Sequence, residues 1–138
     1  MRTYFDTSAL IKLVLDEPGS MIAQAAWNLS DATVSSTLAF PEACAAIGSA
    51  QRAGRLSRVQ VWETIGAVEE RCADMDLLRL DDGVLWSAAM LAVVHRLRGD
   101  DAVHLASAAS LGDPDLLFAT WDQDLAGAAQ AMGYSVVP

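Results

Sequence analysis

The stretch YFDTSALIKL, residues 4–13, passes directly from a strand pattern into a helix pattern and decides the fold class. Residues 3–5 form a short apolar run that ends at Asp6. Within residues 9–14 the apolar side chains recur at helical spacing, and this pattern stops before Pro18. A strand followed at once by a helix is the repeating unit of α/β sheets, so the chain predicts such a sheet from its first residues.

The alternation of strand and helix patterns continues to the end of the chain. Further strands are predicted at residues 32–35, 77–80, 116–120 and 134–137. Further helices are predicted at residues 20–29, 37–53, 57–74, 82–97, 101–111 and 122–132. We therefore expect one α/β domain over residues 1–138, with a mostly parallel central sheet of about four or five strands flanked by about seven helices.

Apolar periodicity also predicts which side of two helices is buried. In the helix at 20–29, the residues that share one apolar face are Ile22, Ala25, Ala26 and Leu29. In the helix at 82–97, the apolar residues at helical spacing are Leu85, Ala89, Val93 and Leu97.

Composition limits the classes of protein to which the chain can belong. A length of 138 residues suffices for one domain, and a hydrophobic fraction of 53% predicts a substantial core. No apolar run approaches the roughly 18 residues of a membrane span, and the start leaves no room for a signal peptide. We therefore expect a cytoplasmic protein without a membrane partner. Cys44 and Cys72 are too few and too isolated for a disulfide framework or a CxxC metal site.

The formal net charge is −9, from 9 Lys and Arg against 18 Asp and Glu. This acidic excess opposes sequence-independent binding of nucleic acid or of an anionic membrane through a basic face. The net charge does not exclude binding of nucleic acid through cations that the protein holds. The net charge therefore opposes binding of RNA or DNA through a broad basic surface, but it does not exclude either as a ligand.

Four acidic residues stand near the predicted carboxyl ends of strands, where ligand sites form in open α/β sheets. Asp6 and Asp122 each follow a strand directly, and Glu42 lies in the helix after the second strand. Asp101 stands at the start of a later helix and can join the other three if that helix begins at the same edge. We expect Asp6, Glu42 and Asp122 to gather at one edge of the sheet.

Each of these positions also has a purely structural interpretation. Asp6, Asp101 and Asp122 stand where helices begin, and Asp is a favoured N-cap, so capping alone is the simpler interpretation of each Asp taken singly. Glu42 differs, because apolar residues flank it on both sides and a buried Glu needs a partner. Converging carboxylates repel one another, and a hard divalent cation such as Mg²⁺ or Mn²⁺ offsets that repulsion. Such an ion can polarise a phosphoryl oxygen and activate water, as in phosphodiester hydrolysis.

Four stretches of the chain carry a resemblance to a known family. They are YFDTSALIKL, STLAFPE, LRGDDAVHLASA and FATWDQDL, at residues 4–13, 36–42, 97–108 and 118–125. In this order they resemble the PIN-domain ribonucleases, and within that group the VapC-type toxins of bacterial toxin–antitoxin pairs. The first and third stretches are the more specific, and the resemblance spans the whole chain.

The resemblance implies metal-dependent endonucleolytic hydrolysis of RNA. It implies that Mg²⁺ or Mn²⁺ is held by the acidic quartet, which is Asp6, Glu42, Asp101 and Asp122. Ser8 matches the small hydroxyl residue beside the first Asp of the family, and Thr120 matches the hydroxyl residue before the fourth. Members of the family usually form homodimers and are held inactive by a small VapB-type antitoxin whose C-terminal segment covers the site.

Three neighbouring residues leave alternatives open. Asp100 precedes Asp101 where the family more often has a non-acidic residue, although the register of DAVHLA favours Asp101 as the inward one. Asp124 adds a carboxylate close to Asp122, and a first-turn helix charge is its simpler interpretation. His104 lies one helical turn after Asp101, so it is either a general base or, by the stronger expectation, a packing or supporting residue.

Two further groups of residues admit both a functional and a structural interpretation. Arg52, Arg55 and Arg58 surround the Gly54 turn; they either contact substrate phosphate or a partner, or form a solvated corner, which is the simpler expectation. The tryptophans of the predicted helices either mark a homodimer seam or partner groove or, more simply, pack in the core; they are Trp27, Trp62 and Trp86.

Other classes of function fit the sequence less well. An aspartyl-phosphate phosphatase needs a second Asp two residues after Asp6, where this chain has Ser8. A response-regulator receiver needs a Lys near its last strands, and the chain has none there. A non-catalytic interaction module of the same fold, or a PIN nuclease outside a toxin–antitoxin pair, remains the alternative to a toxin ribonuclease.

Overall fold

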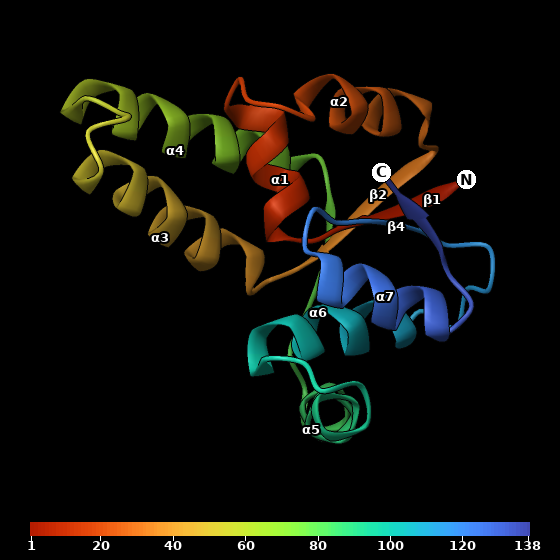
Figure 1. Ribbon diagram of the computed structural model, residues 1–138. Helices are drawn as coiled ribbons and strands as arrows, with labels where there is room; N and C mark the ends of the chain where they lie inside the picture. The colour runs from red at the N-terminus through yellow and green to blue at the C-terminus, as the bar shows by residue number, and fades with distance from the viewer.

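Strand β1 lies at the centre of a five-stranded parallel sheet in the computed structural model, which describes residues 1–138 (Figure 1). The strand order is β3-β2-β1-β4-β5. The strands are β1 Arg2–Phe5, β2 Ala32–Ser36, β3 Asp76–Leu78, β4 Leu117–Ala119 and β5 Ser135–Val137. Every pair of neighbours is parallel, so the expected α/β sheet is confirmed.

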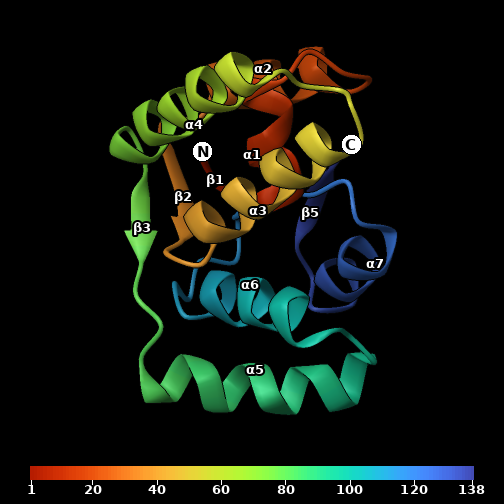
Figure 2. The ribbon, with the colours of Figure 1, turned by 90° about the vertical axis from the view of Figure 1, so that its left-hand side faces the viewer.

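Seven helices cover the two faces of this sheet, as the alternation of patterns predicts. They are α1 Thr7–Val14, α2 Ser20–Leu29, α3 Ala39–Arg52, α4 Arg58–Ala73, α5 Asp82–His95, α6 Gly99–Ala109 and α7 Gln123–Ala131. Helices α1 to α4 pack on one face, and α6 and α7 lie on the other, with α5 packed against the outer side of α6 (Figures 1 and 2). None of them is long and apolar enough to cross a membrane.

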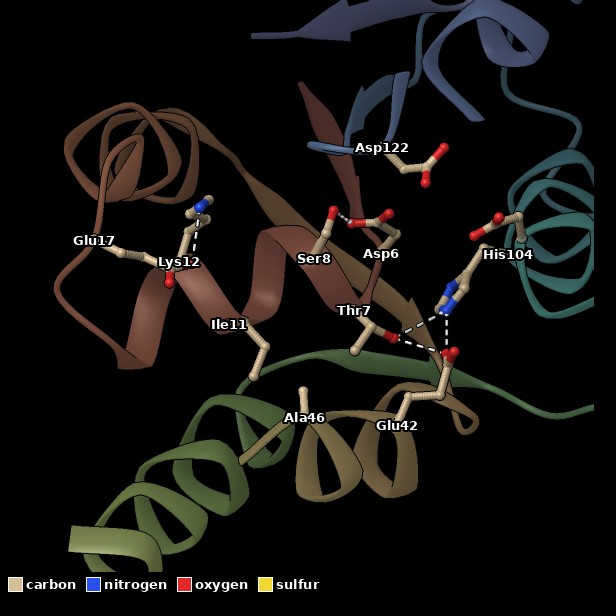
Figure 3. Close-up of a pocket in the computed structure, with 11 residues that line it drawn as sticks. Asp6, Thr7, Ser8, Ile11, Lys12, Glu17, Glu42, Ala46, His104 and Asp122 are labelled. Atoms are coloured by element: carbon tan, nitrogen blue, oxygen red, sulfur yellow. Dashed lines mark hydrogen bonds and ion pairs between the residues drawn. The ribbon is translucent and has the colours of Figure 1, made fainter. Parts of the chain in front are cut away.

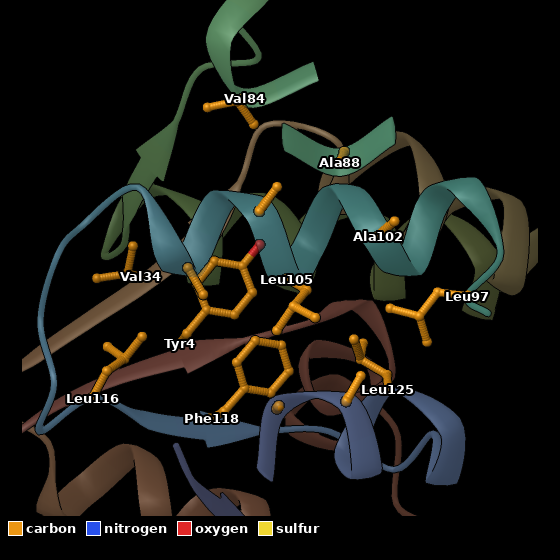
Figure 4. Close-up of a cluster of buried hydrophobic side chains, with 14 residues drawn as sticks. Tyr4, Val34, Val84, Ala88, Leu97, Ala102, Leu105, Leu116, Phe118 and Leu125 are labelled. Carbon is orange, nitrogen blue, oxygen red and sulfur yellow. The ribbon is translucent and has the colours of Figure 1, made fainter. Parts of the chain in front are cut away.

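The central strand β1 contributes side chains to one hydrophobic core on each side of the sheet, because successive strand residues point to opposite faces. Tyr4 is fully buried and stacks on Phe118 of β4, with Leu105 of α6 in the same cluster (Figure 4). Phe5 points the other way, into the cluster with Leu10 of α1. A strand buried on both faces is typical of parallel sheets, and this explains the unbroken apolar run at residues 3–5.

The apolar faces predicted for α2 and α5 are mostly exposed. Ala26 is the one residue of either predicted face that is buried within its helix, and Leu97 is buried beyond the end of α5; the exposed ones are Ile22, Ala25, Leu29, Leu85, Ala89 and Val93. In α2 the buried residues are Ala23 and Ala26, whereas Leu29 is 72% exposed. In α5 they are Val84 and Ala88, whereas Val93 is 76% exposed. Both helices carry apolar residues around much of their circumference, so periodicity cannot decide which side meets the sheet.

The strand order creates a ligand-binding position beside β1. The chain leaves β1 toward β2 and β3 on one side, then crosses to β4 and β5 on the other side. The carboxyl ends of β1 and β4 therefore lie together where the connections diverge, and the backbone N–H of Asp6 donates to the carbonyl of Ala119 at 3.1 Å. Open α/β sheets bind ligands at such switch points.

Candidate active site

A pocket of about 390 Å³ lies at the carboxyl end of β1 (Figure 3). All four acidic residues singled out from the sequence line it, and these are Asp6, Glu42, Asp101 and Asp122. Ser8 and His104 line it as well, and Thr120 lies directly behind Asp6. The structure therefore brings together side chains from α1, α3, α6 and the start of α7.

Asp6 is the most firmly held of the four carboxylates. Its Oδ1 accepts hydrogen bonds from Ser8 Oγ at 2.7 Å and from the backbone N–H of Ala9 at 2.8 Å. Its Oδ2 accepts from Thr120 Oγ1 at 2.6 Å. Burial raises the pKa of Asp6, and the hydrogen bond from Thr120 offsets part of that rise. Asp6 also caps α1, so capping and facing the pocket are two roles of one side chain.

Ser8 and Thr120 tie the start of α7 to Asp6. Ser8 Oγ accepts a hydrogen bond from the backbone N–H of Trp121 at 2.8 Å, and Thr120 Oγ1 accepts one from the N–H of Asp122 at 3.1 Å. Asp122 caps α7 through Oδ1, which accepts from the N–H of Leu125 at 2.8 Å. The two hydroxyl residues therefore set the relative position of the first and fourth carboxylates.

Glu42 belongs to a hydrogen-bonded group that crosses the sheet. Its Oε1 accepts from Thr7 Oγ1 at 2.7 Å and lies 2.6 Å from His104 Nε2 (Figure 3). An ionised carboxylate only accepts hydrogen bonds, so Nε2 is the protonated ring nitrogen in this contact. On the far side of the ring, the buried Tyr4 hydroxyl lies 2.9 Å from Nδ1. Burial acts to raise the pKa of Glu42, but the hydrogen bonds from His104 and Thr7 outweigh it and lower the pKa.

This group explains how a Glu in an apolar stretch is accommodated. His104 is 2% exposed, and both of its ring nitrogens have partners. It reaches the pocket through Glu42, which is the supporting position expected from sequence in preference to an isolated base.

Asp101 stands in a different environment from Asp6. Helix α6 begins at Gly99 with Arg98 as its N-cap, so the capping interpretation of Asp101 is wrong. Burial, followed by the charges of Asp122 and Asp100, raises the pKa of Asp101 to about 6. Asp100 is placed beside Arg98, with Oδ2 at 3.2 Å from Nη2, and it does not line the pocket.

The donor set of the pocket suits a hard divalent cation, although no three acidic or His side chains converge into a ready-made ion site. Five carboxylates line this pocket, the acidic quartet and Glu17, and no cysteine does. Oxygen ligands are those that Mg²⁺ and Mn²⁺ prefer. Mg²⁺ usually keeps several water ligands and binds through one or two carboxylates plus substrate phosphates, so a closed cage is not required. Burial first, and then the neighbouring carboxylates, raise the pKa of Asp101, and a bound cation would counteract the repulsion between the carboxylates.

Sequence reasoning missed three polar residues of the pocket, namely Thr7, Lys12 and Glu17, and the apolar Ile11 and Ala46. Lys12 stands four residues after Ser8, one turn along the same helix face, and this spacing was the available signal. Thr7 and Glu17 carried no comparable signal, because their contacts depend on α3 and on the α1–α2 loop. Asp124 is exposed in the first turn of α7, as its structural interpretation predicts.

Trp27, Trp62, Trp86 and the arginines around Gly54 do not line the pocket. Trp27 packs edge-on against Phe5, as expected of a core residue. The core interpretation is wrong for Trp62 and Trp86, which are 67% and 69% exposed. The arginines around the Gly54 turn are exposed and form no ion pair, and they are Arg52, Arg55 and Arg58.

Comparison with known proteins agrees with this architecture. The family model of the PIN domain matches residues 3–130. The ribonuclease VapC45 of Mycobacterium tuberculosis is 43% identical over 135 residues, which cover 98% of this chain and 94% of the relative. A toxin–antitoxin complex from Klebsiella pneumoniae superposes with a TM-score of 0.69 at 20% identity, covering 99% of this chain and 96% of that one. The sarcin–ricin-loop-cleaving toxin VapC20 of M. tuberculosis superposes with a TM-score of 0.72 at 15% identity, over 96% and 95% of the two chains.

Proposed function

This chain belongs to the PIN-domain family and is a VapC-type ribonuclease, and we propose that it hydrolyses RNA at the pocket lined by Asp6, Glu42, Asp101 and Asp122. The observation that carries the proposal is that these four carboxylates, far apart in sequence, line one pocket at the switch point of the sheet. We extend the proposal to Mg²⁺ or Mn²⁺ as the cofactor, held by the same four residues.

A divalent ion in this pocket would supply Lewis-acid polarisation of the scissile phosphate and activation of water. The chain contributes preorganised carboxylates. Ser8 and Thr120 hold both oxygens of Asp6, and Thr7 and His104 hold one oxygen of Glu42. Fixed ligands of this kind lose little conformational freedom when an ion binds.

We propose a VapB-type antitoxin as the protein partner, in a toxin–antitoxin pair located in the cytoplasm. The similar Klebsiella pneumoniae structure is a toxin–antitoxin complex, and the acidic pocket would attract a basic segment of such a partner. We also propose a homodimer. Trp62 on α4 and Trp86 on α5 are exposed aromatic residues of the kind enriched at protein interfaces.

Cleavage of a mixed-sequence RNA by the purified protein tests the reaction and the cofactor together. We expect cleavage in Mn²⁺ or Mg²⁺, none in excess EDTA, and recovery when the ion is restored. Asp101→Asn should abolish cleavage while the circular-dichroism spectrum is unchanged. Asp124→Asn is the matched control, because it removes the same charge from an exposed carboxylate outside the pocket. Full activity of Asp101→Asn, or activity in excess EDTA, would contradict the proposal.

Binding of Mn²⁺ separates the enzyme from a non-catalytic interaction module. Calorimetric titration should show Mn²⁺ binding to the wild type and much weaker binding to Asp101→Asn. Absence of binding to the wild type, together with tight capture of an antitoxin, would favour the interaction module.

A further inference from the structure

Lys12 is the one basic side chain of Lys or Arg type that lines the acidic pocket, and it is the single lysine of the chain. Its Nζ lies 2.7 Å from Glu17 Oε1, and the two side chains are 15% and 27% exposed. Figure 3 shows this pair on one side of the pocket and Glu42 with His104 on the other. The pocket is therefore acidic where the four carboxylates gather and carries the Lys12–Glu17 ion pair at its opposite end.

The position of Lys12 is set by the same elements that hold Asp6. It follows Ser8 by one turn of α1, about 6 Å along the helix axis. Its ammonium group also lies 5.8 Å from the centre of the Trp121 ring, and the N–H of Trp121 donates to Ser8. The position of the Lys12 side chain relative to Asp6 is therefore fixed by α1 and by Trp121.

Glu17 is placed opposite Lys12 by a tight loop between α1 and α2. The N–H of Glu17 donates to Ser20 Oγ at 3.1 Å, and Ser20 Oγ donates to the Leu15 carbonyl at 2.7 Å. Gly19 has a φ of +96° and packs so closely on Trp121 that a Cβ atom would lie 2.5 Å from the indole nitrogen. The loop therefore needs glycine there, and its shape directs Glu17 toward Lys12.

The chemistry of this pair suits an exchangeable contact with an anion. Both side chains of the Lys12–Glu17 ion pair are mostly buried, so the Lys12 ammonium group needs an anionic partner, and a phosphate that takes the place of Glu17 would supply one. Lysine binds phosphate as a point charge. An RNA strand whose scissile phosphate lies among the carboxylates must leave the pocket past its rim, and Lys12 offers the one cationic side chain in that lining.

We propose that Lys12 binds a phosphate of the RNA strand next to the scissile one, and that Glu17 holds Lys12 at the rim until that phosphate replaces it. The inference rests on the proposed ribonuclease function and names a substrate-binding residue outside the acidic quartet. Lys12 thus acts on RNA affinity, and the carboxylates act on the chemical step.

Single-turnover cleavage of a short single-stranded RNA of mixed sequence, in Mn²⁺ and at several KCl concentrations, tests the inference. The half-saturating protein concentration reports binding, and the maximal rate reports the chemical step. We expect Lys12→Met to raise the half-saturating protein concentration about 10-fold, because it removes roughly one charged hydrogen bond to the RNA. The maximal rate should be nearly unchanged. The slope of log affinity against log KCl should become shallower by about 0.7, the value for one phosphate of a single strand.

Three further variants distinguish phosphate binding from a structural role of Lys12. Lys12→Arg should keep the wild-type salt slope, and Glu17→Gln should tighten binding because it removes the competing carboxylate. Arg2→Met is the matched control, since Arg2 pairs with Asp113 at the opposite end of β1 and its loss should leave the slope unchanged.

Two results would overturn the inference. If Lys12→Met keeps the wild-type affinity and salt slope while the wild type cleaves RNA, Lys12 does not bind the strand. If Lys12→Met lowers only the melting temperature and the maximal rate, Lys12 fastens the α1–α2 loop instead. Failure of the wild type to cleave any RNA would overturn the proposed function itself, together with this inference.

Discussion

Asp6 and Asp101 face the same pocket from opposite kinds of surroundings. Asp6 accepts three hydrogen bonds at the ends of β1 and β4 and is 3% exposed. Asp101 in the first turn of α6 has no hydrogen-bond partner, and burial and neighbouring carboxylates raise its pKa to about 6. The fold thus stabilises the charge of Asp6 with hydrogen bonds and leaves the charge of Asp101 without one, among neighbouring carboxylates.

The largest effect is expected when Asp6 or Asp101 is replaced by Ala. Both substitutions should lower RNA cleavage to a similar extent, but only the substitution of Asp6 should lower the stability of the protein. Asp6→Ala and Asp101→Ala should each lower RNA cleavage by more than about 100-fold. This loss exceeds the one typical of residues that only hydrogen-bond to a metal ligand. Asp6→Ala should also lower the free energy of unfolding by about 1–3 kcal/mol, because it removes an N-cap and leaves two hydroxyl donors without their acceptor.

Urea denaturation in EDTA measures the stability half of this prediction. Asp101→Ala should unfold at the same or a higher urea concentration than the wild type, because it removes an unpaired charge from a crowded set. Equal destabilisation by both substitutions would break the contrast between the two carboxylates.

A smaller effect is expected from replacing His104, which contacts the carboxylate of Glu42. His104→Gln should lower cleavage by about 10–100-fold, mainly by raising the Mn²⁺ concentration needed for half-maximal activity, because Glu42 loses its ring partner. His95→Gln, at the end of α5 and outside the pocket, is the matched control. Wild-type metal dependence in His104→Gln would show that Glu42 is positioned without the ring.

Tyr4→Phe extends the test one step further from the pocket. It removes the hydroxyl that contacts His104 Nδ1 and keeps the ring that stacks on Phe118. We expect a loss of about 1 kcal/mol in unfolding free energy and a smaller shift in metal dependence than in His104→Gln. A larger activity loss in Tyr4→Phe than in His104→Gln would contradict this order.

The smallest expected effect is a pH dependence of stability in the absence of metal. The folded-state pKa of Asp101 is raised from 3.8 to about 6, so the folded protein binds this proton more tightly than the unfolded chain does. The resulting stabilisation is fully present below pH 4 and is lost as the pH rises through about 6. Urea midpoints of the wild type minus those of Asp101→Asn should therefore decrease over this window. A constant difference would show that Asp101 titrates normally.

Much of the fold could be predicted because its signals are local. The strand-to-helix passage after residue 5, and the glycine and proline breaks between later elements, depend on short stretches of sequence. The buried faces of α2 and α5 could not be predicted, because apolar residues on several sides of a helix leave the choice to the neighbouring elements.

The candidate site divides in the same way. The acidic quartet could be proposed from residue type and from position after strands, together with the family resemblance. The partners of each carboxylate could not, because Thr120 lies 114 positions from Asp6 and His104 lies 62 from Glu42. The choice between Asp100 and Asp101 also depended on the first turn of α6, which directs Asp101 to the pocket and leaves Asp100 beside Arg98.

The sequence by itself determined the α/β class, the order of the elements and the acidic residues that stand where strands end. These properties depend on periodicity and chemistry within a few neighbouring residues. Only the tertiary structure decided that Asp6 is satisfied and Asp101 is not, and that Lys12 meets Glu17 at the rim of the same pocket. Those facts depend on distances across the sheet and between helices and loops, and they emerge only when the whole chain has packed.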